Sequence, residues 1–281
     1  MALFSDVLLT ADLDRTLTDR HAVVPERNIE AIRYFMENGG AFTVNTGRSL
    51  SMYGKYRQEI PSNAPLLLFN GSAAYDPETE TFSQCHAIDL DMKKTVKELL
   101  ERYPDASLEV QGLKAHYVFR EDPMWESFYS ESGCHWVLTE PNRVPGPFLK
   151  MCIQGKLKGK GVSNLFQGTP EELARFDQIE RELRETYGDK ITVFRSGARI
   201  LDIHANGVSK AKAARNLQKK LGRKILVCAG DSGNDLPMME DADFAFCPAD
   251  GDLAEQFPNV CECGQGAVAD VIYKKIPEII G

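Results

Sequence analysis

The 281-residue chain has no long apolar run, and no segment approaches the roughly 20 consecutive apolar residues that a membrane-spanning helix needs. It also lacks an excess of positive charge, because 33 Lys and Arg residues stand against 41 Asp and Glu, for a formal net charge of −8. A basic surface is what gives proteins general affinity for nucleic acid or anionic membrane. The first residues contain no basic segment of the kind that begins a secretory signal. We therefore expect a cytoplasmic protein without a nucleic-acid or membrane partner.

The cysteines and histidines lack the spacings of disulfide frameworks and zinc sites. Seven cysteines, an odd number, and five histidines are scattered along the chain. Cys261-Glu262-Cys263 has a single intervening residue and no second pair nearby, so we interpret it as ordinary packing. The glycine-rich run 155–161 has the wrong glycine spacing for a phosphate loop, and no Ser or Thr follows its lysine. Reduced thiols in a reducing compartment are therefore expected.

Strand-like and helix-like segments alternate at both ends of the chain. Apolar runs bounded by Gly, Pro and polar residues predict strands at 7–11, 41–45, 66–69, 224–229 and 243–247. Periodic apolar patterns between them predict helices at 25–38, 49–58, 208–221, 234–240 and 266–275. This alternation is typical of an α/β protein with a parallel sheet.

The middle of the chain follows another pattern, which predicts strands near 107–111 and 115–119 and helices near 91–103, 122–131 and 170–187. A chain of this length is expected to hold a large core and a second, smaller domain. We predict a core made of residues 1–81 and 196–281, with residues 82–195 forming an inserted α+β domain. An insertion beside a site would act as a lid that excludes water and selects substrates.

Polar residues follow four of the predicted strands, and the carboxyl ends of parallel strands meet at one edge of a sheet, where α/β folds bind ligands. Any one of these groups is also what a turn or a helix cap would contain. Their joint occurrence predicts a phosphoryl-transfer site built from four groups of residues: Asp12 and Asp14; Thr46, Gly47 and Arg48; Asn70, Gly71 and Ser72; and Asp231, Asn234 and Asp235.

The carboxylates suit distinct tasks in such a site. Asp12 can attack phosphorus and form an acyl phosphate. Mg²⁺ prefers carboxylate, carbonyl and water oxygens, which makes Asp12 and Asp231 its natural side-chain ligands. Asp14 lies two residues further on the same side of an extended strand, and it can donate a proton to the leaving oxygen and later accept one from water.

Other residues suit the phosphate. Thr46 offers a hydroxyl, and Gly47 allows the backbone to approach closely. Lys210 starts a predicted helix, where its ammonium and the free N–H groups favour an anion, although a lone lysine there is more often a solvated surface charge.

These segments resemble the four ordered motifs of the haloacid dehalogenase (HAD) superfamily, namely residues 12–17, Thr46-Gly47-Arg48, Lys210 and residues 230–235. The long insertion between the second and third motifs resembles the Cof-type subclass IIB, whose members carry an α/β cap. The resemblance implies a Rossmann-like core, Mg²⁺ as cofactor, and hydrolysis of phosphate monoesters through an aspartyl-phosphate on Asp12.

The resemblance also implies a role for each site residue. Asp12, the main-chain carbonyl of Asp14, and Asp231 would bind the metal, and Asp235 would support them. The phosphate or substrate would be bound by Thr46, Gly47, Arg48, Lys210 and Asn234. Arg15 departs from the family, which usually has Gly there. If the backbone at this position needs a positive φ, Arg imposes strain; otherwise it adds a bulky cation near the site.

The predicted function is hydrolysis of a small phosphorylated metabolite, for which we favour a sugar phosphate. Two alternatives stay open: a phosphomutase of the phosphomannomutase type, and a non-catalytic protein that binds a phosphorylated ligand. Trp125, Trp136, Lys114 and Lys150 of the inserted domain are candidates for substrate selection, but Trp is more often a core residue. The sequence does not indicate an oligomeric state.

Overall fold

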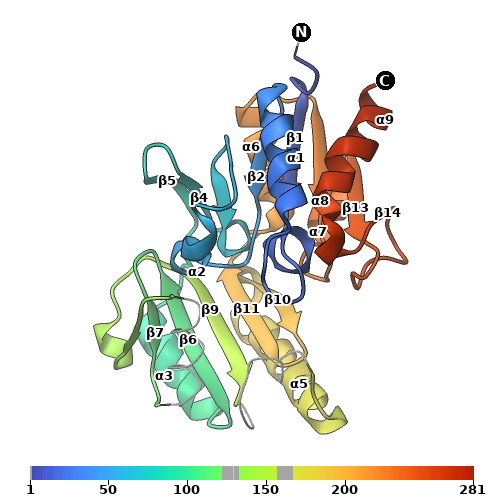
Figure 1. Ribbon diagram of the computed structural model, residues 1–281. Helices are drawn as coiled ribbons and strands as arrows, with labels where there is room; N and C mark the ends of the chain where they lie inside the picture. The colour runs from blue at the N-terminus through green and yellow to red at the C-terminus, as the bar shows by residue number, and fades with distance from the viewer. Residues whose placement is uncertain (1, 122–128, 130–132, 157–166) are drawn as a thin grey trace. The chain divides into compact units, whose positions relative to one another are not determined.

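The computed structural model describes residues 2–121, 129, 133–156 and 167–281 (Figure 1). It divides into two compact units. The first comprises Met1–Arg48, Tyr56–Gln84 and Ser209–Gly281, and the second comprises Ser49–Lys55 and Cys85–Val208. Three expectations from the sequence fall wholly or partly outside the described residues: Trp125, the helix at 122–131 and the glycine-rich run 155–161.

A five-stranded parallel sheet forms the centre of the first unit. Its strands, in spatial order, are β14 (Asn259–Val260), β13 (Phe244–Pro248), β12 (Ile225–Ala229), β1 (Val7–Ala11) and β2 (Ala41–Val44). Leu9 of β1 lies opposite Val227 on one side and Phe42 on the other. All five residues of β1 are buried, as expected for a central strand covered on both faces. The predicted α/β class with a parallel sheet is confirmed.

The strand expected at 66–69 pairs differently from the others. β3 (Leu66–Leu68) forms an antiparallel pair with β4 (Ala73–Asp76), and β5 (Thr81–Cys85) completes a three-stranded sheet. A single parallel bridge joins Leu67 to Asn45, just beyond β2. This bridge keeps the end of β3 beside the ends of the parallel strands.

Helices pack on the parallel sheet. α1 (Glu26–Glu37) lies across the face turned to the viewer in Figure 1 and packs with α8 (Ala267–Asp270), which continues through residues 271–275 into α9 (Ile276–Ile280). Ile29, Ile32 and Phe35 are buried in α1, at the helical spacing that the sequence predicts. Apolar residues of α6 (Lys210–Lys220) and α7 (Leu236–Asp241) form a separate cluster with Leu8 and Leu226 of the sheet.

The second unit contains a six-stranded mixed sheet. Its strands, in spatial order, are β10 (Ile191–Gly197), β11 (Ile200–Ala205), β9 (Phe148–Gly155), β6 (Ala106–Gly112), β7 (His116–Val118) and β8 (Trp136–Leu138). Only β7 and β8 are parallel among these pairs. Residues 196–208, expected in the core, belong to this unit because β11 pairs with both β9 and β10.

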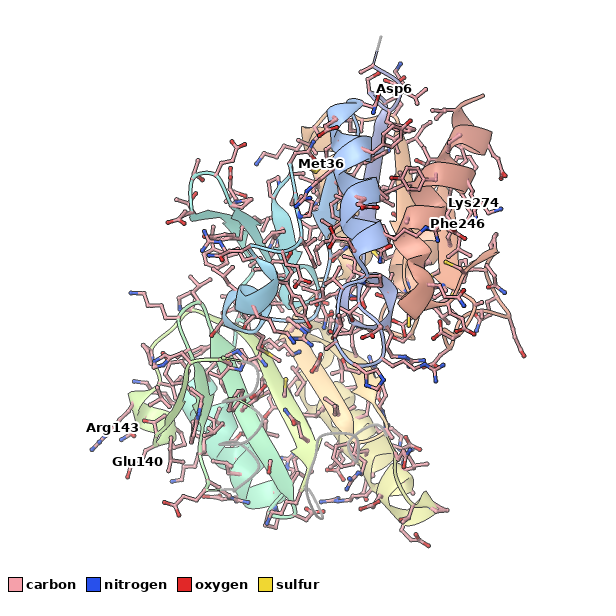
Figure 2. The ribbon with its side chains drawn as sticks, viewed as in Figure 1. Asp6, Met36, Glu140, Arg143, Phe246 and Lys274 are labelled. Atoms are coloured by element: carbon pink, nitrogen blue, oxygen red, sulfur yellow. The ribbon has the colours of Figure 1, made fainter. Side chains whose placement is uncertain are left out.

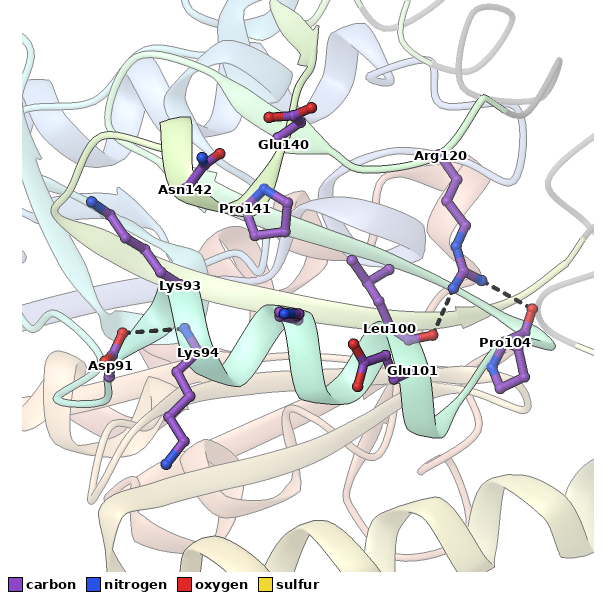
Figure 3. Close-up of a pocket in the computed structure, with 11 residues that line it drawn as sticks. Asp91, Lys93, Lys94, Leu100, Glu101, Pro104, Arg120, Glu140, Pro141 and Asn142 are labelled. Carbon is purple, nitrogen blue, oxygen red and sulfur yellow. Dashed lines mark hydrogen bonds between the residues drawn. The ribbon is translucent and has the colours of Figure 1, made fainter.

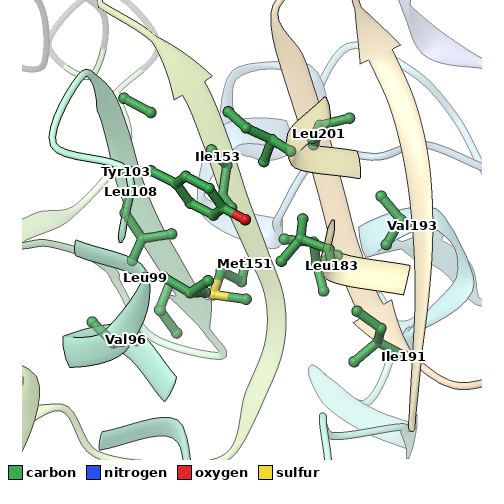
Figure 4. Close-up of a cluster of buried hydrophobic side chains, with 14 of the residues drawn as sticks. Val96, Leu99, Tyr103, Leu108, Met151, Ile153, Leu183, Ile191, Val193 and Leu201 are labelled. Carbon is green, nitrogen blue, oxygen red and sulfur yellow. The ribbon is translucent and has the colours of Figure 1, made fainter. Parts of the chain in front are cut away.

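Two helices of the second unit cover one face of its sheet, α3 (Met92–Arg102) and α5 (Pro170–Tyr187). Figure 4 shows their apolar side chains packed with those of the strands, including Leu99, Leu183, Met151 and Leu201. The helix expected at 49–58 is shorter in the structure, with α2 at Leu50–Tyr53 and a 3₁₀ turn at Gly54–Tyr56.

Figure 2 draws the side chains and labels Asp6, Glu140 and Arg143, each of which takes part in an exposed ion pair. Asp6 pairs with Lys224 at 2.9 Å, and Glu140 pairs with Arg143 at 3.9 Å. Such pairs are screened by water and salt, so each contributes little to stability. Among the described residues, no helix has the length and apolar character needed to cross a bilayer.

Replacing Leu183 with Ala should destabilise the second unit by about 2–5 kcal/mol, because its side chain is fully buried between α5 and the sheet. The matched control is Leu173→Ala in the same helix, where the side chain is 37% exposed and the loss should be within about 0.5 kcal/mol. Urea unfolding followed by circular dichroism measures both. Equal losses in the two variants would contradict this account of the core.

Candidate active site

The ends of the parallel strands hold the first catalytic candidates in place through backbone hydrogen bonds. The N–H of Asp12, directly after β1, donates to the carbonyl of Ala229 at 2.9 Å. On the other side, the N–H of Asn45 donates to the carbonyl of Ala11, also at 2.9 Å. Ladder bonding thus continues past the strand ends, and Asp12 and Asn45 have fixed positions at the sheet edge.

Lys210 is buried between two carboxylates. Its Nζ lies 2.5 Å from Oδ1 of Asp12 and 2.6 Å from Oδ1 of Asp235. Only 1% of Lys210 is exposed, so it is not the solvated surface charge that its position in the sequence commonly indicates. Ser209 caps α6 by accepting a hydrogen bond from the N–H of Lys212, and the amide of Asn45 donates to the carbonyl of Lys210 at 3.0 Å.

Asp12, Asp231 and Asp235 form a buried acidic cluster, with carboxylate oxygens within 4.8 Å of one another. Both oxygens of Asp235 accept hydrogen bonds: one from Lys210, and the other from the N–H groups of Asp231 and Ser232 at 3.1 and 3.2 Å. Asp235 therefore holds the loop after β12 in shape. Asp12 and Asp231 are the better placed to bind a cation, and hard carboxylate oxygens suit Mg²⁺.

The cluster carries more negative than positive charge. Burial, followed by the proximity of Asp235, raises the pKa of Asp12 to about 7 even though Lys210 opposes the shift. Burial and the neighbouring Asp235 and Asp12 raise the pKa of Asp231 to about 8. Burial alone would lower the pKa of Lys210, but Asp12 and Asp235 overcome this effect and raise it. The Lys210 ammonium and the partly exposed guanidinium of Arg15, which lies beside Asp231, do not balance three carboxylates, and a divalent cation would relieve the excess.

Asp14 is bound to Arg48. Nε and Nη2 of Arg48 donate to the two carboxylate oxygens of Asp14 at 2.9 and 2.6 Å. This fork-like geometry is the strong form of an Arg–carboxylate pair. The Arg48 guanidinium also lies 5.5 Å from the ring centre of Tyr56. The proposed acid/base and a proposed substrate ligand therefore contact each other, while the Asp14 side chain stays 48% exposed.

The second and third strand ends meet closely. A Cβ added to Gly47 would lie 2.8 Å from Oδ1 of Asn70, so a larger residue would collide there. The N–H of Asn70 donates to the carbonyl of Thr46 at 2.9 Å, and the Thr46 hydroxyl accepts from the N–H of Arg48 at 3.2 Å. Asn70 itself has a φ of 54°, a conformation that Asn tolerates better than most residues.

The structure also shows contacts that sequence reasoning missed. Asn45 anchors Lys210, and Arg15 lies beside Asp231 with Nη1 3.6 Å from Oδ2. The only available signal for Asn45 was its place at the end of a predicted strand. Asn234, predicted to bind substrate, accepts a hydrogen bond from the hydroxyl of Ser232 at 2.9 Å.

A groove in the second unit has different chemistry (Figure 3). Its volume is about 990 Å³, and α3 and residues 140–142 line it. Arg120 at its edge donates to the carbonyls of Leu100 and Pro104, so it caps the end of α3. The lining contains no counterpart of the Asp12–Lys210 pair, and this groove is not the catalytic candidate.

Comparison with known proteins agrees with the architecture. The family model described as haloacid dehalogenase-like hydrolase matches residues 9–252. A 5-amino-6-(5-phospho-D-ribitylamino)uracil phosphatase of Bacillus subtilis is 23% identical over 260 residues, or 90% of each chain. A haloacid dehalogenase-like hydrolase from Bacteroides thetaiotaomicron has a TM-score of 0.80 at 19% identity, covering 95% of this chain and 98% of its own. A solved HAD subclass IIB sugar phosphatase has a TM-score of 0.72 at 18% identity, with coverages of 97% and 99%.

The chain belongs to the haloacid dehalogenase-like hydrolase family, because the family match spans most of its length and includes the first and last motifs. The chain is thus an enzyme of a hydrolase family, and the curated relatives that it resembles are named as phosphatases. The family, the fold class and the enzymatic character predicted from the sequence are confirmed.

Without metal, the free energy of unfolding of Asp231→Asn minus that of wild type should increase as the pH rises from about 5 to 9. A carboxyl whose pKa is raised by folding binds its proton more tightly in the folded state, so wild type loses stability as the pH rises from 3.8 through the raised pKa of about 8. The variant lacks this loss. Urea unfolding in EDTA at several pH values measures the difference, and a difference independent of pH would contradict the charge balance described above.

Proposed function

We propose that the protein is a magnesium-dependent phosphatase that hydrolyses the phosphate ester of a sugar-like metabolite through a phosphorylated Asp12. The observation that carries this proposal is the buried Asp12 carboxylate, held by Lys210 next to Asp231. A buried carboxylate with one oxygen bound to an ammonium has its other oxygen available for attack. The family match and the phosphatase relatives support the same chemistry.

The residues present fit the metal. Asp12, Asp231 and the main-chain carbonyl of Asp14 would hold Mg²⁺, which when bound screens the negative charge of the approaching phosphoryl group. The fit rests on the acidic cluster itself, because its oxygen-only donor set and excess negative charge favour a hard divalent cation over a softer metal.

The reaction would proceed in two displacements. Asp12 attacks phosphorus, the bond to the leaving oxygen breaks, and that oxygen takes a proton from Asp14. Water then attacks the phosphorus of the acyl phosphate while Asp14 accepts a proton, which releases phosphate and restores Asp12. Thr46 and the N–H of Gly47 would hold phosphoryl oxygens, and Lys210 would keep Asp12 oriented throughout.

Two kinds of observation support a sugar-like leaving group: the substrates named for relatives and the polar face of the sheet in the second unit. The Bacillus relative acts, by its name, on a phosphorylated ribitylamino compound, and one structural neighbour is a sugar phosphatase. Within the second unit, strand alternation places polar side chains on one face of the sheet and apolar ones on the other. The buried polar residues on the strands of this sheet include Glu109, Gln111, Lys150, Gln154, Asp202 and His204.

This polar face has the groups that recognise hydroxyls. Nζ of Lys150 lies 2.7 Å from Oδ2 of Asp202, which also accepts a hydrogen bond from Ser196 at 2.6 Å. Gln111 donates to Glu109. We propose that this face selects the sugar portion of the substrate.

We also propose a reducing, cytoplasmic location, because all seven cysteines are free thiols.

Asp12→Asn should lower kcat for a responsive member of a phosphosugar panel by about 10³-fold or more, because the amide is a poor nucleophile. Asp6→Asn is the matched control, since Asp6 precedes the same strand at its other end and pairs with exposed Lys224. Phosphate release measures activity, and circular dichroism checks folding. Full activity in Asp12→Asn would refute the covalent mechanism. If wild type converted the phosphosugar to an isomer without releasing phosphate, the protein would be a mutase.

Gln111→Leu should raise KM for a phosphosugar by about tenfold or more, because a sugar hydroxyl that faces the leucine loses its hydrogen-bond partner. The same variant should change kcat/KM for p-nitrophenyl phosphate much less, since that ester has no sugar hydroxyls. Steady-state kinetics on the two substrates measure the ratio. Equal losses for both substrates would contradict a role of the polar face in selecting the sugar.

A further inference from the structure

Arg15 adopts a backbone conformation that favours glycine. Its φ is 59° and its ψ is 13°, which lies in the left-handed region. The loop after β1 therefore needs a positive φ at this position, and Arg15 adopts it with strain. Strained residues of this kind persist when the surrounding structure holds them, and they cluster at functional sites.

Contacts with two separate parts of the first unit hold the Arg15 side chain. Nη1 lies 3.6 Å from Oδ2 of Asp231. Nη2 donates to the carbonyl of Asp250 at 3.2 Å and to Oδ1 of Asp252 at 3.4 Å. The guanidinium thus points one amino group toward a buried carboxylate and keeps the other on the loop 250–252.

This loop is firmly attached to the acidic cluster. The N–H of Leu253 donates to the carbonyl of Asp231 at 3.1 Å, and a Cβ on Gly251 would lie 3.2 Å from the Asp231 Cβ. The Asp250 carboxylate accepts hydrogen bonds from the N–H of Cys263 at 2.9 Å and from Arg20 at 3.1 Å. Arg15 therefore remains beside Asp231 even when its contact with that carboxylate is given up.

The two basic residues of the site have different partners. Lys210 contacts Asp12 and Asp235, whereas Arg15 is the basic residue within ion-pair distance of Asp231 among the residues that the structure describes. Asp231 is only 2% exposed, so its charge has little compensation from water. At 3.6 Å the Arg15 contact is an ion pair without a hydrogen bond, so a metal ion bound by Asp231 would have to offset the loss of this ion pair alone.

We propose that Arg15 is a built-in counter-cation of Asp231 that competes with Mg²⁺ and so raises the Mg²⁺ concentration needed to fill the site. This inference rests on the proposed function, because it assumes that Asp231 is a metal ligand. Before the metal binds, Arg15 offsets the buried charge of Asp231. After it binds, the guanidinium stays tethered to Asp250 and Asp252 and repels the bound ion.

The test is Mg²⁺ binding by isothermal titration calorimetry to wild type and to three variants, Arg15→Gln, Arg15→Gly and Arg15→Lys. Gln is shorter than Arg but keeps a polar side chain and the strained backbone while it removes the charge. Gly removes both the charge and the strain, and Lys keeps the charge. We expect Gln and Gly to bind Mg²⁺ about tenfold more tightly than wild type, and Lys to stay within about threefold of it.

A second measurement does not depend on catalysis. In EDTA at pH 8, Arg15→Gln should have a lower Tm than Arg15→Lys, because Asp231 loses its cationic neighbour, and saturating Mg²⁺ should narrow that gap. If only Arg15→Gly bound Mg²⁺ more tightly than wild type, the strained backbone and not the charge of Arg15 would limit the affinity, and the proposal would be overturned. Equal affinities in all four proteins would overturn it while leaving Mg²⁺ dependence intact. Binding by none of them would overturn both this proposal and the proposed Mg²⁺ dependence.

Discussion

The buried ammonium of Lys210 is the interaction on which the candidate site depends. Removing carboxylates from water is costly unless they are paired, and Lys210 pairs with Asp12 and Asp235 at the same time. Asp235 extends the connection to the backbone after β12, and Asn45 connects the carbonyl of Lys210 to the end of β2. Lys210, through its ammonium and its main-chain carbonyl, therefore joins three strand ends to the start of a helix.

Two arginines complete the charge pattern around this centre. Arg48 holds Asp14 with two hydrogen bonds, and Arg15 lies beside Asp231. Each carboxylate that the mechanism assigns a task thus already has a cationic neighbour. Under the proposed function, binding of substrate or metal exchanges one ionic partner for another, which costs less than desolvating an unpaired charge.

Much of this could be predicted from the sequence, because the relevant signals are local. Apolar runs that end in polar residues indicated strands at 7–11, 41–45, 224–229 and 243–247, and each bound lies within one residue of that in the structure. The glycines at strand ends are also visible in the sequence, but the need for glycine there comes from contacts made in the tertiary structure. Gly230 is needed because a Cβ there would lie 2.6 Å from the Cβ of Asp235.

The sequence by itself determined the α/β alternation, the order of the acidic and polar strand ends, and the family, because periodicity and motif spacing are written along the chain. Only the tertiary structure decided that Lys210 is buried, that Arg48 binds Asp14, and that β11 joins the second sheet rather than the first. Burial and partner choice depend on residues far away in the chain, such as Asp12, 198 positions from Lys210. A local pattern shows which groups are present, while the packing of distant segments sets which of them meet and how much water reaches them.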